Sequence, residues 1–89
     1  MGEVLAVLRI MPEDVEVDLE ELKRSISEKI PEEVEIHKIE EEPIAFGLKA
    51  LRITVIVSDT VGGTDPVEEA IREIDGVRSV EVVDLHRLL

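Results

Sequence analysis

The sequence contains no cysteine, asparagine, glutamine, tryptophan or tyrosine, and Phe46 is its only aromatic residue. The lack of cysteine excludes disulfides, thiolate metal sites and thiol catalysis. With one aromatic residue, the chain lacks the stacking side chains that RNA-recognition modules need. No apolar run approaches the ~18 residues of a membrane-spanning helix. The missing thermolabile amides and a charged fraction of 36% resemble the composition of thermophile proteins.

Positive charge is also scarce, because 10 basic residues stand against 22 acidic ones and give a net charge of -12. A surface of this kind repels phosphate backbones and anionic lipids, so we expect neither nucleic acid nor a membrane as a partner. It favours a basic protein partner, or simply keeps the chain soluble. No charged-then-apolar leader precedes the first expected strand, which predicts a cytoplasmic protein.

Residues 1–89 are expected to form a single domain with a modest core and no deep, enclosed active site. His37 and His86 lack the spacing of metal ligands, so no metal site is predicted. Gly62 and Gly63 are not followed by the Lys-Ser/Thr pair of a phosphate-binding loop. No nucleophile lies in a strained, glycine-flanked turn. We therefore predict no catalytic residues and no cofactor.

Four segments have the pattern of β-strands. Residues 51–57 form the longest β-branched run and are apolar on both faces, which predicts a central strand, and residues 3–11 have the same character. Residues 33–39 carry charges on one face, which favours the edge of the sheet. Residues 77–83 form the last strand, followed by a short tail, residues 84–89.

Two segments have the pattern of amphipathic helices. Asp18 is a candidate cap for the first helix, which Pro31 ends. Asp65 is the candidate cap of the second helix, with Pro66 in its first turn and Gly76 after its end. The helical positions expected in the core are Leu22, Ile26, Ile71 and Ile74.

The resulting order, β-α-β-β-α-β, predicts a ferredoxin-like α+β sandwich. Its four-stranded antiparallel sheet has the order 4-1-3-2, with two helices on one face. Pro43 cannot donate a ladder hydrogen bond and is expected in the turn before the third strand, which Phe46 begins. We further expect the first and third strands to run in the same direction. The end of the fourth strand then lies beside the start of the third.

This arrangement brings Phe46 and Arg87 to one edge of the sheet, about 10 Å apart at ~4.8 Å per strand. An aromatic residue and an arginine together are typical of binding hot spots. Two simpler interpretations remain open, in which Phe46 fills the core and Arg87 is a solvated residue of the tail.

The run Pro43-Ile44-Ala45-Phe46-Gly47-Leu48-Lys49-Ala50-Leu51 resembles translation elongation factor 1-beta, the guanine-nucleotide exchange factor for elongation factor 1-alpha. Eukaryotic members carry a similar Pro-Ile-Gly-Phe-Gly-Ile-Lys-Lys-Leu run. The similarity continues through residues 59–65 and 77–82, and the Arg-Leu-Leu end is similar to the archaeal branch.

The resemblance implies a function in translation elongation, with elongation factor 1-alpha as the partner and without covalent chemistry. It implies that the aromatic residue matching Phe46 packs against the GTPase. The residue matching Arg87 is a lysine in eukaryotic members, and it is pushed toward the magnesium site of the partner. The expected partner-binding residues are Pro43, Ile44, Ala45, Phe46, Gly47, Arg87 and Leu88. The alternative is a small-ligand-binding regulatory domain of the same fold, since such domains have weak local signatures.

Overall fold

The computed structural model describes residues 2–58 and 63–88. Residues 1, 59–62 and 89 lie outside the described part, so Gly62 and the last residue of the expected tail are not considered further. The elements follow one another as β1 (Glu3–Pro12), α1 (Leu19–Lys29), β2 (Glu35–Ala45), β3 (Leu48–Ser58), α2 (Asp65–Arg72) and β4 (Val77–Leu88). This order is the predicted one.

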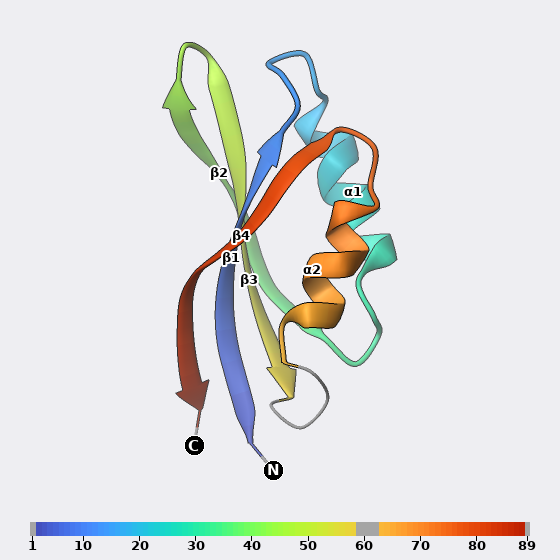
Figure 1. Ribbon diagram of the computed structural model, residues 1–89, viewed down its shortest axis with the longest axis vertical. Coiled ribbons are helices and arrows are strands. Elements are labelled where there is room, and N and C mark those ends of the chain that lie inside the picture. Colours follow the sequence, from blue (N-terminus) through green and yellow to red (C-terminus); the bar gives the residue numbers. More distant parts are fainter. Residues whose placement is uncertain (1, 59–62, 89) are drawn as a thin grey trace.

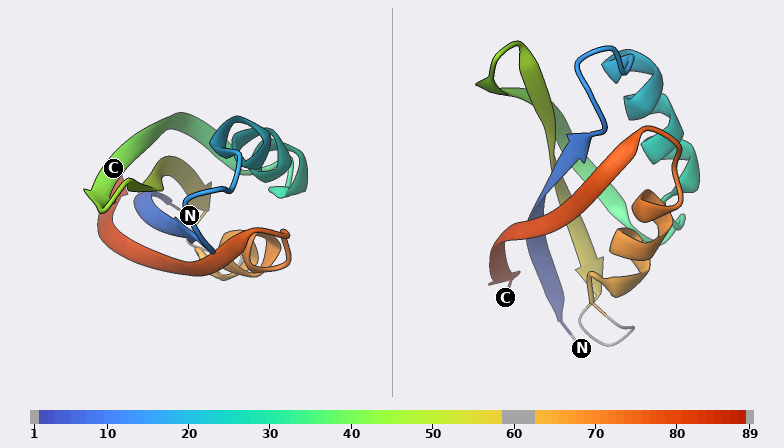
Figure 2. Two further views of the ribbon diagram at one scale, coloured as in Figure 1. Left: turned by 90° about the horizontal axis from the view of Figure 1, so that it is seen from above. Right: turned by 45° about the horizontal axis from the view of Figure 1, so that its top comes forward.

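The four strands form one sheet in the order β2-β3-β1-β4, and every neighbouring pair is antiparallel. Both helices cover the same face of the sheet, which is strongly twisted (Figures 1 and 2). This arrangement is the predicted ferredoxin-like α+β sandwich. The two strands that are apolar on both faces, β1 and β3, lie in the centre as expected.

The core lies between the sheet and the two helices. Alternate residues of β1 and β3 point into it because successive side chains of a strand face opposite sides. Residues that are fully excluded from solvent on these strands include Leu8, Ile10, Leu51 and Ile53. The four residues predicted in the core from the helical pattern, Leu22, Ile26, Ile71 and Ile74, are all buried in the same cluster, but Ile74 lies just past the end of α2 and not in the helix.

The predicted direction of the strands is wrong. β1 runs antiparallel to β3, pairing Val4 with Val57 and Ile10 with Leu51. The helical crossover through α1 brings the chain back parallel to β1, and the following hairpin then reverses it. β4 is also antiparallel to β1, so β3 and β4 run in the same direction.

The helix boundaries agree with the capping signals in one case and differ in the other. The carboxylate of Asp18 accepts hydrogen bonds from two backbone N–H groups of the first turn of α1, at 3.0 and 3.3 Å. The N-cap of α2 is Thr64, and its hydroxyl donates to the carboxylate of Glu68 at 3.0 Å. Asp65 is therefore the first helical residue and not the cap. Its charge still suits the positive end of the helix dipole.

Candidate functional site

The β2–β3 connection is a two-residue turn formed by Phe46 and Gly47. Both residues have positive φ angles, 52° and 81°, as a type I′ hairpin turn requires. The prediction that Pro43 forms this turn is wrong, because Pro43 lies within β2 and pairs with Lys49. An edge strand tolerates proline because the missing N–H group can face solvent.

Phe46 is fully exposed, at 102% of its reference area, so the interpretation that it fills the core is wrong. It is also the only non-glycine residue with a positive φ in the described part of the chain. A left-handed backbone costs an L-residue about 1–2 kcal/mol, and asparagine or glycine is the usual residue at this position. Neither burial nor backbone preference explains a phenylalanine here. Such strained positions cluster at functional sites.

The turn lies at the tip of a two-stranded ribbon that extends beyond the body of the sheet (Figure 1). Among the described residues, Ile10 and Leu51 are the last paired positions of β1 and β3, and past them β3 pairs only with β2. A β-bulge between Pro43 and Ala45 leaves Ile44 as the extra residue, 44% exposed. All five predicted residues of this segment are exposed, namely Pro43, Ile44, Ala45, Phe46 and Gly47. We call residues 43–49 the hairpin tip.

One apolar residue near the tip was not predicted. Val15, in the loop between β1 and α1, is 61% exposed. A hollow of about 220 Å³ lies between this loop and the tip, and its lining includes Val15, Leu19, Gly47 and Lys49. A single valine within the acidic stretch 13–16 is the signal that could have identified it. The apolar surface at this end of the molecule therefore extends beyond the hairpin tip.

The residues predicted near the C-terminus lie at the other end of the molecule. β4 continues to Leu88, so the expected tail is an ordered strand through that residue. Arg87 is exposed and pairs with Val4, whose neighbour on the other side is Val57. About 30 Å of strand, at ~3.3 Å per residue, separates Val57 from Leu48 at the hairpin tip. The predicted meeting of Phe46 and Arg87 at one sheet edge is therefore wrong.

The end of β4 also carries an exposed carboxylate–imidazole contact. The Nε2 atom of His86 lies 3.0 Å from Oδ2 of Asp84. This hydrogen bond, with a smaller contribution from the backbone N–H of Leu85, lowers the pKa of the Asp84 carboxyl below its ordinary value. The contact lies beside Arg87 at the end of the strand, and both side chains are open to solvent.

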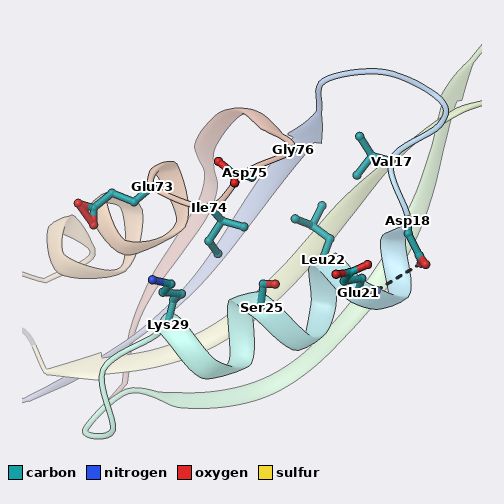
Figure 3. A pocket seen from close by; sticks show the side chains of 10 residues that line it. All are labelled: Val17, Asp18, Glu21, Leu22, Ser25, Lys29, Glu73, Ile74, Asp75 and Gly76. Atoms are coloured by element: carbon teal, nitrogen blue, oxygen red, sulfur yellow. Dashed lines mark hydrogen bonds between the residues drawn. The ribbon is translucent and has the colours of Figure 1, made fainter.

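A second hollow lies between α1 and the end of α2 (Figure 3). It has a volume of about 530 Å³ and is the natural place for the ligand of a small-ligand-binding regulatory domain. Four carboxylates line it, from Asp18, Glu21, Glu73 and Asp75, against the single ammonium group of Lys29. The Asp18 carboxylate already caps α1. Four carboxylates against one ammonium group give this lining an excess of negative charge, which disfavours an anionic metabolite.

The fold and the exposed strained turn define a small ferredoxin-like protein whose distinctive feature is a projecting apolar tip. The EF-1 guanine nucleotide exchange domain family matches residues 5–88, and the chain belongs to this family. It is a nucleotide exchange factor of translation elongation. The family resemblance inferred from the Phe-Gly run is confirmed.

Three relatives illustrate the similarity, each named elongation factor 1-beta. The proteins of Methanothermobacter thermautotrophicus and Methanobrevibacter smithii are 54% and 55% identical to this chain, and each match covers 100% of both sequences. The protein of Staphylothermus marinus is 47% identical, with 99% of each sequence covered. Within the described ranges, no helix is long and apolar enough to cross a membrane.

Proposed function

We propose that the chain binds elongation factor 1-alpha and accelerates the release of GDP from it, with residues 1–89 acting as one exchange domain in the cytoplasm. No covalent bond is made or broken. The factor acts by binding the nucleotide-free state of the GTPase more tightly than the GDP-bound state, which shifts the partner toward release. The similarity to relatives named elongation factor 1-beta supports this partner.

The observation that carries the proposal is the state of Phe46, fully exposed in a left-handed turn. A buried phenylalanine contributes several kcal/mol to stability, whereas the side chain of Phe46 is exposed to water in a turn with a strained backbone. Aromatic residues are preferred anchors of protein interfaces because they bury a large area with little loss of side-chain entropy. In the proposed complex, Phe46 is the anchor. Its exposed neighbours Ile44 and Ala45 extend the contact.

Arg87 has a separate part in the proposal. A cation brought to the magnesium site of the partner competes electrostatically with Mg²⁺, and the loss of Mg²⁺ weakens the hold on the phosphates of GDP. Arg87 carries the required charge at the exposed end of β4, and half-buried Leu88 follows it. Because Phe46 and Arg87 lie at opposite ends of a molecule with a long axis of 42 Å, the factor must touch two separate regions of its partner.

The direct experiment is to measure GDP release from the cognate GTPase with and without this protein. We expect faster release that saturates with protein concentration. Phe46→Ala should reduce this acceleration while leaving the protein folded, with a stability change well below the ~3–5 kcal/mol of a buried phenylalanine truncation. Unchanged GDP release at saturating wild-type protein would refute the proposed function.

A further inference from the structure

Glu42 of β2 joins three strands through its carboxylate, at the point where the ribbon leaves the sheet. Its Oε1 atom accepts from Nε of Arg9 on β1 at 3.0 Å, and its Oε2 atom accepts from Nη1 of Arg52 on β3 at 3.2 Å. The three side chains are only about one-third exposed, at 30%, 33% and 36% respectively. Charge-assisted hydrogen bonds of this kind are stronger than those between neutral groups.

The contact with Arg9 spans an intervening strand. β2 and β1 are separated by β3, which places their backbones about 10 Å apart at ~4.8 Å per strand. The cross-strand neighbour of Glu42 is Ala50, which is small and completely buried. Arg9 and Arg52 are direct cross-strand partners, and the Glu42 carboxylate offsets the repulsion between their like charges by contacting both.

Glu41, the preceding residue, makes the corresponding contact on the helix face. It pairs with Leu51, whose side chain is in the core, and its carboxylate lies 3.1 Å from Nζ of Lys23 on α1. Lys49 lies 3.7 Å from the same carboxylate. The Lys23 ammonium group lowers the pKa of the Glu41 carboxyl below its ordinary value. The base of the ribbon is thus tied to β1 on one face of the sheet and to α1 on the other.

We propose that Glu42 is a positioning residue for nucleotide exchange, holding the hairpin tip at a fixed angle to the sheet through Arg9 and Arg52, with Glu41 as its counterpart on the helix face. The inference rests on the proposed function, because its consequence for exchange acts through Phe46. Past Leu51 the tip has no backbone hydrogen bonds to β1 among the described residues. Side-chain contacts at the base of the ribbon therefore determine how rigidly the hairpin tip is held relative to the sheet.

An isolated surface ion pair would have little effect, since most such pairs contribute about 0–1 kcal/mol. This contact differs in two respects. It is a shared network, with Arg9 also lying 3.7 Å from Glu81 on β4, so it involves all four strands. It also acts at the base of the ribbon, where a small change in the angle between the ribbon and the sheet displaces Phe46 at the far end. A loosely held tip should distort the bound GTPase less. The maximal rate of exchange should therefore fall more than the affinity of the factor for the GTPase.

The test compares Glu42→Gln, which keeps the size of the side chain and removes its charge, with Glu35→Gln. Glu35 is the matched control, because it is an exposed carboxylate on the same strand whose cross-strand partner is Ile56, so it lies outside the contact with Arg9 and Arg52. For Glu42→Gln we expect amide hydrogen exchange of the hairpin tip to rise roughly threefold or more, with the β1–β3 amides unchanged. The maximal rate of GDP release should fall by a similar factor, with the half-saturating concentration little changed.

Glu42→Asp distinguishes the effect of the negative charge from the effect of side-chain length. It keeps the carboxylate but is one methylene shorter, so it should not bridge to β1 and should behave like Glu42→Gln. Full activity of Glu42→Asp, or identical behaviour of Glu42→Gln and Glu35→Gln in both measurements, would overturn the proposal. If the wild-type protein itself does not accelerate GDP release, the proposed function fails and the role of Glu42 in exchange fails with it. The hydrogen-exchange comparison still decides independently whether Glu42 holds the tip.

Discussion

Phe46 and Arg87 lie at opposite ends of one continuous antiparallel sheet. Arg87 pairs with Val4 and Val4 with Val57, at the end of β3 that is farthest from the turn containing Phe46. Two groups placed in this way cannot form one hot spot. A rigid sheet can, however, hold them at a constant separation, so that each end contacts its own region of the partner. This relationship makes the stiffness of the sheet and of its ribbon part of the proposed mechanism.

The first prediction concerns the strain in the turn. Phe46→Asn creates an Asn-Gly pair, which is favoured in a type I′ turn. We expect the free energy of unfolding to rise by about 1 kcal/mol, because the left-handed conformation no longer opposes folding. Exchange activity should fall, because the anchor is gone. Urea denaturation and GDP-release rates measure the two effects. Phe46→Ala is the control, since alanine loses the anchor but keeps the backbone strain. A loss of stability in the asparagine variant would contradict the strain argument.

Periodicity in the sequence predicted the elements and the core well, because each strand and helix carries its own apolar stripe. Leu22, Ile26, Ile71 and Ile74 are buried as their spacing indicates. The order of the strands followed from the chirality of the crossovers. These features depend on local patterns and on general rules of connection.

Features that depend on register between distant segments could not be predicted in this way. The contact between Arg9 and Glu42 joins residues 33 positions apart and requires the pairing of three strands. The predicted position of Pro43 is wrong because proline is typical both of turns and of edge strands. The predicted direction of β3 is wrong because the hairpin between β2 and β3 reverses the chain, so that β3 runs against both β2 and β1. The positive φ of Phe46 has no local signal, since phenylalanine is unusual in that conformation.

The second prediction concerns pH and the contact between Glu41 and Lys23. The pKa of Glu41 is lowered chiefly by its hydrogen bond from Lys23, and the pKa of Lys23 is raised by Glu20 first and then by Glu41. The contribution of Glu41 to stability is therefore present above its unfolded-state pKa and is lost as the pH falls through the lower folded-state value. The contribution of Lys23 is present below its unfolded-state pKa and is lost as the pH rises through the higher folded-state value. Lys23→Gln should raise the pKa of Glu41, as measured by carboxyl NMR titration. An unchanged titration curve would show that the contact is not populated in solution.

The third prediction concerns the independence of the two ends. Residues more than about 7–10 Å apart that share no partners usually have additive effects on free energy. The losses of transition-state stabilisation in Phe46→Ala and Arg87→Ala should therefore add in the double variant, to within about 0.5 kcal/mol. Rates of GDP release for the four proteins of this double-mutant cycle provide the measurement. A double variant no slower than the slower single variant would mean that the sites act as one unit, with cation delivery depending entirely on the aromatic anchor.

The fourth prediction concerns Arg87 and the magnesium ion of the partner. If the charge of Arg87 acts at that ion, Arg87→Ala should slow GDP release while leaving complex formation nearly intact. The defect should be large at high Mg²⁺ and small at low Mg²⁺, because GDP is already loosely held when the metal is scarce. Arg87→Lys should retain most of the activity, since a point charge is sufficient for repulsion.

The competing explanation of such a defect is a simple surface ion pair between Arg87 and the partner, worth about 0–1 kcal/mol. That explanation predicts weaker binding that declines further with salt and has no particular dependence on Mg²⁺. Exchange rates at two Mg²⁺ concentrations and constant ionic strength distinguish the two. A defect of equal size at both concentrations would exclude action at the magnesium site and would leave the assignment as an exchange factor intact. A defect that grows with Mg²⁺ and is rescued by lysine would identify the end of β4 as the part of the protein that displaces the metal.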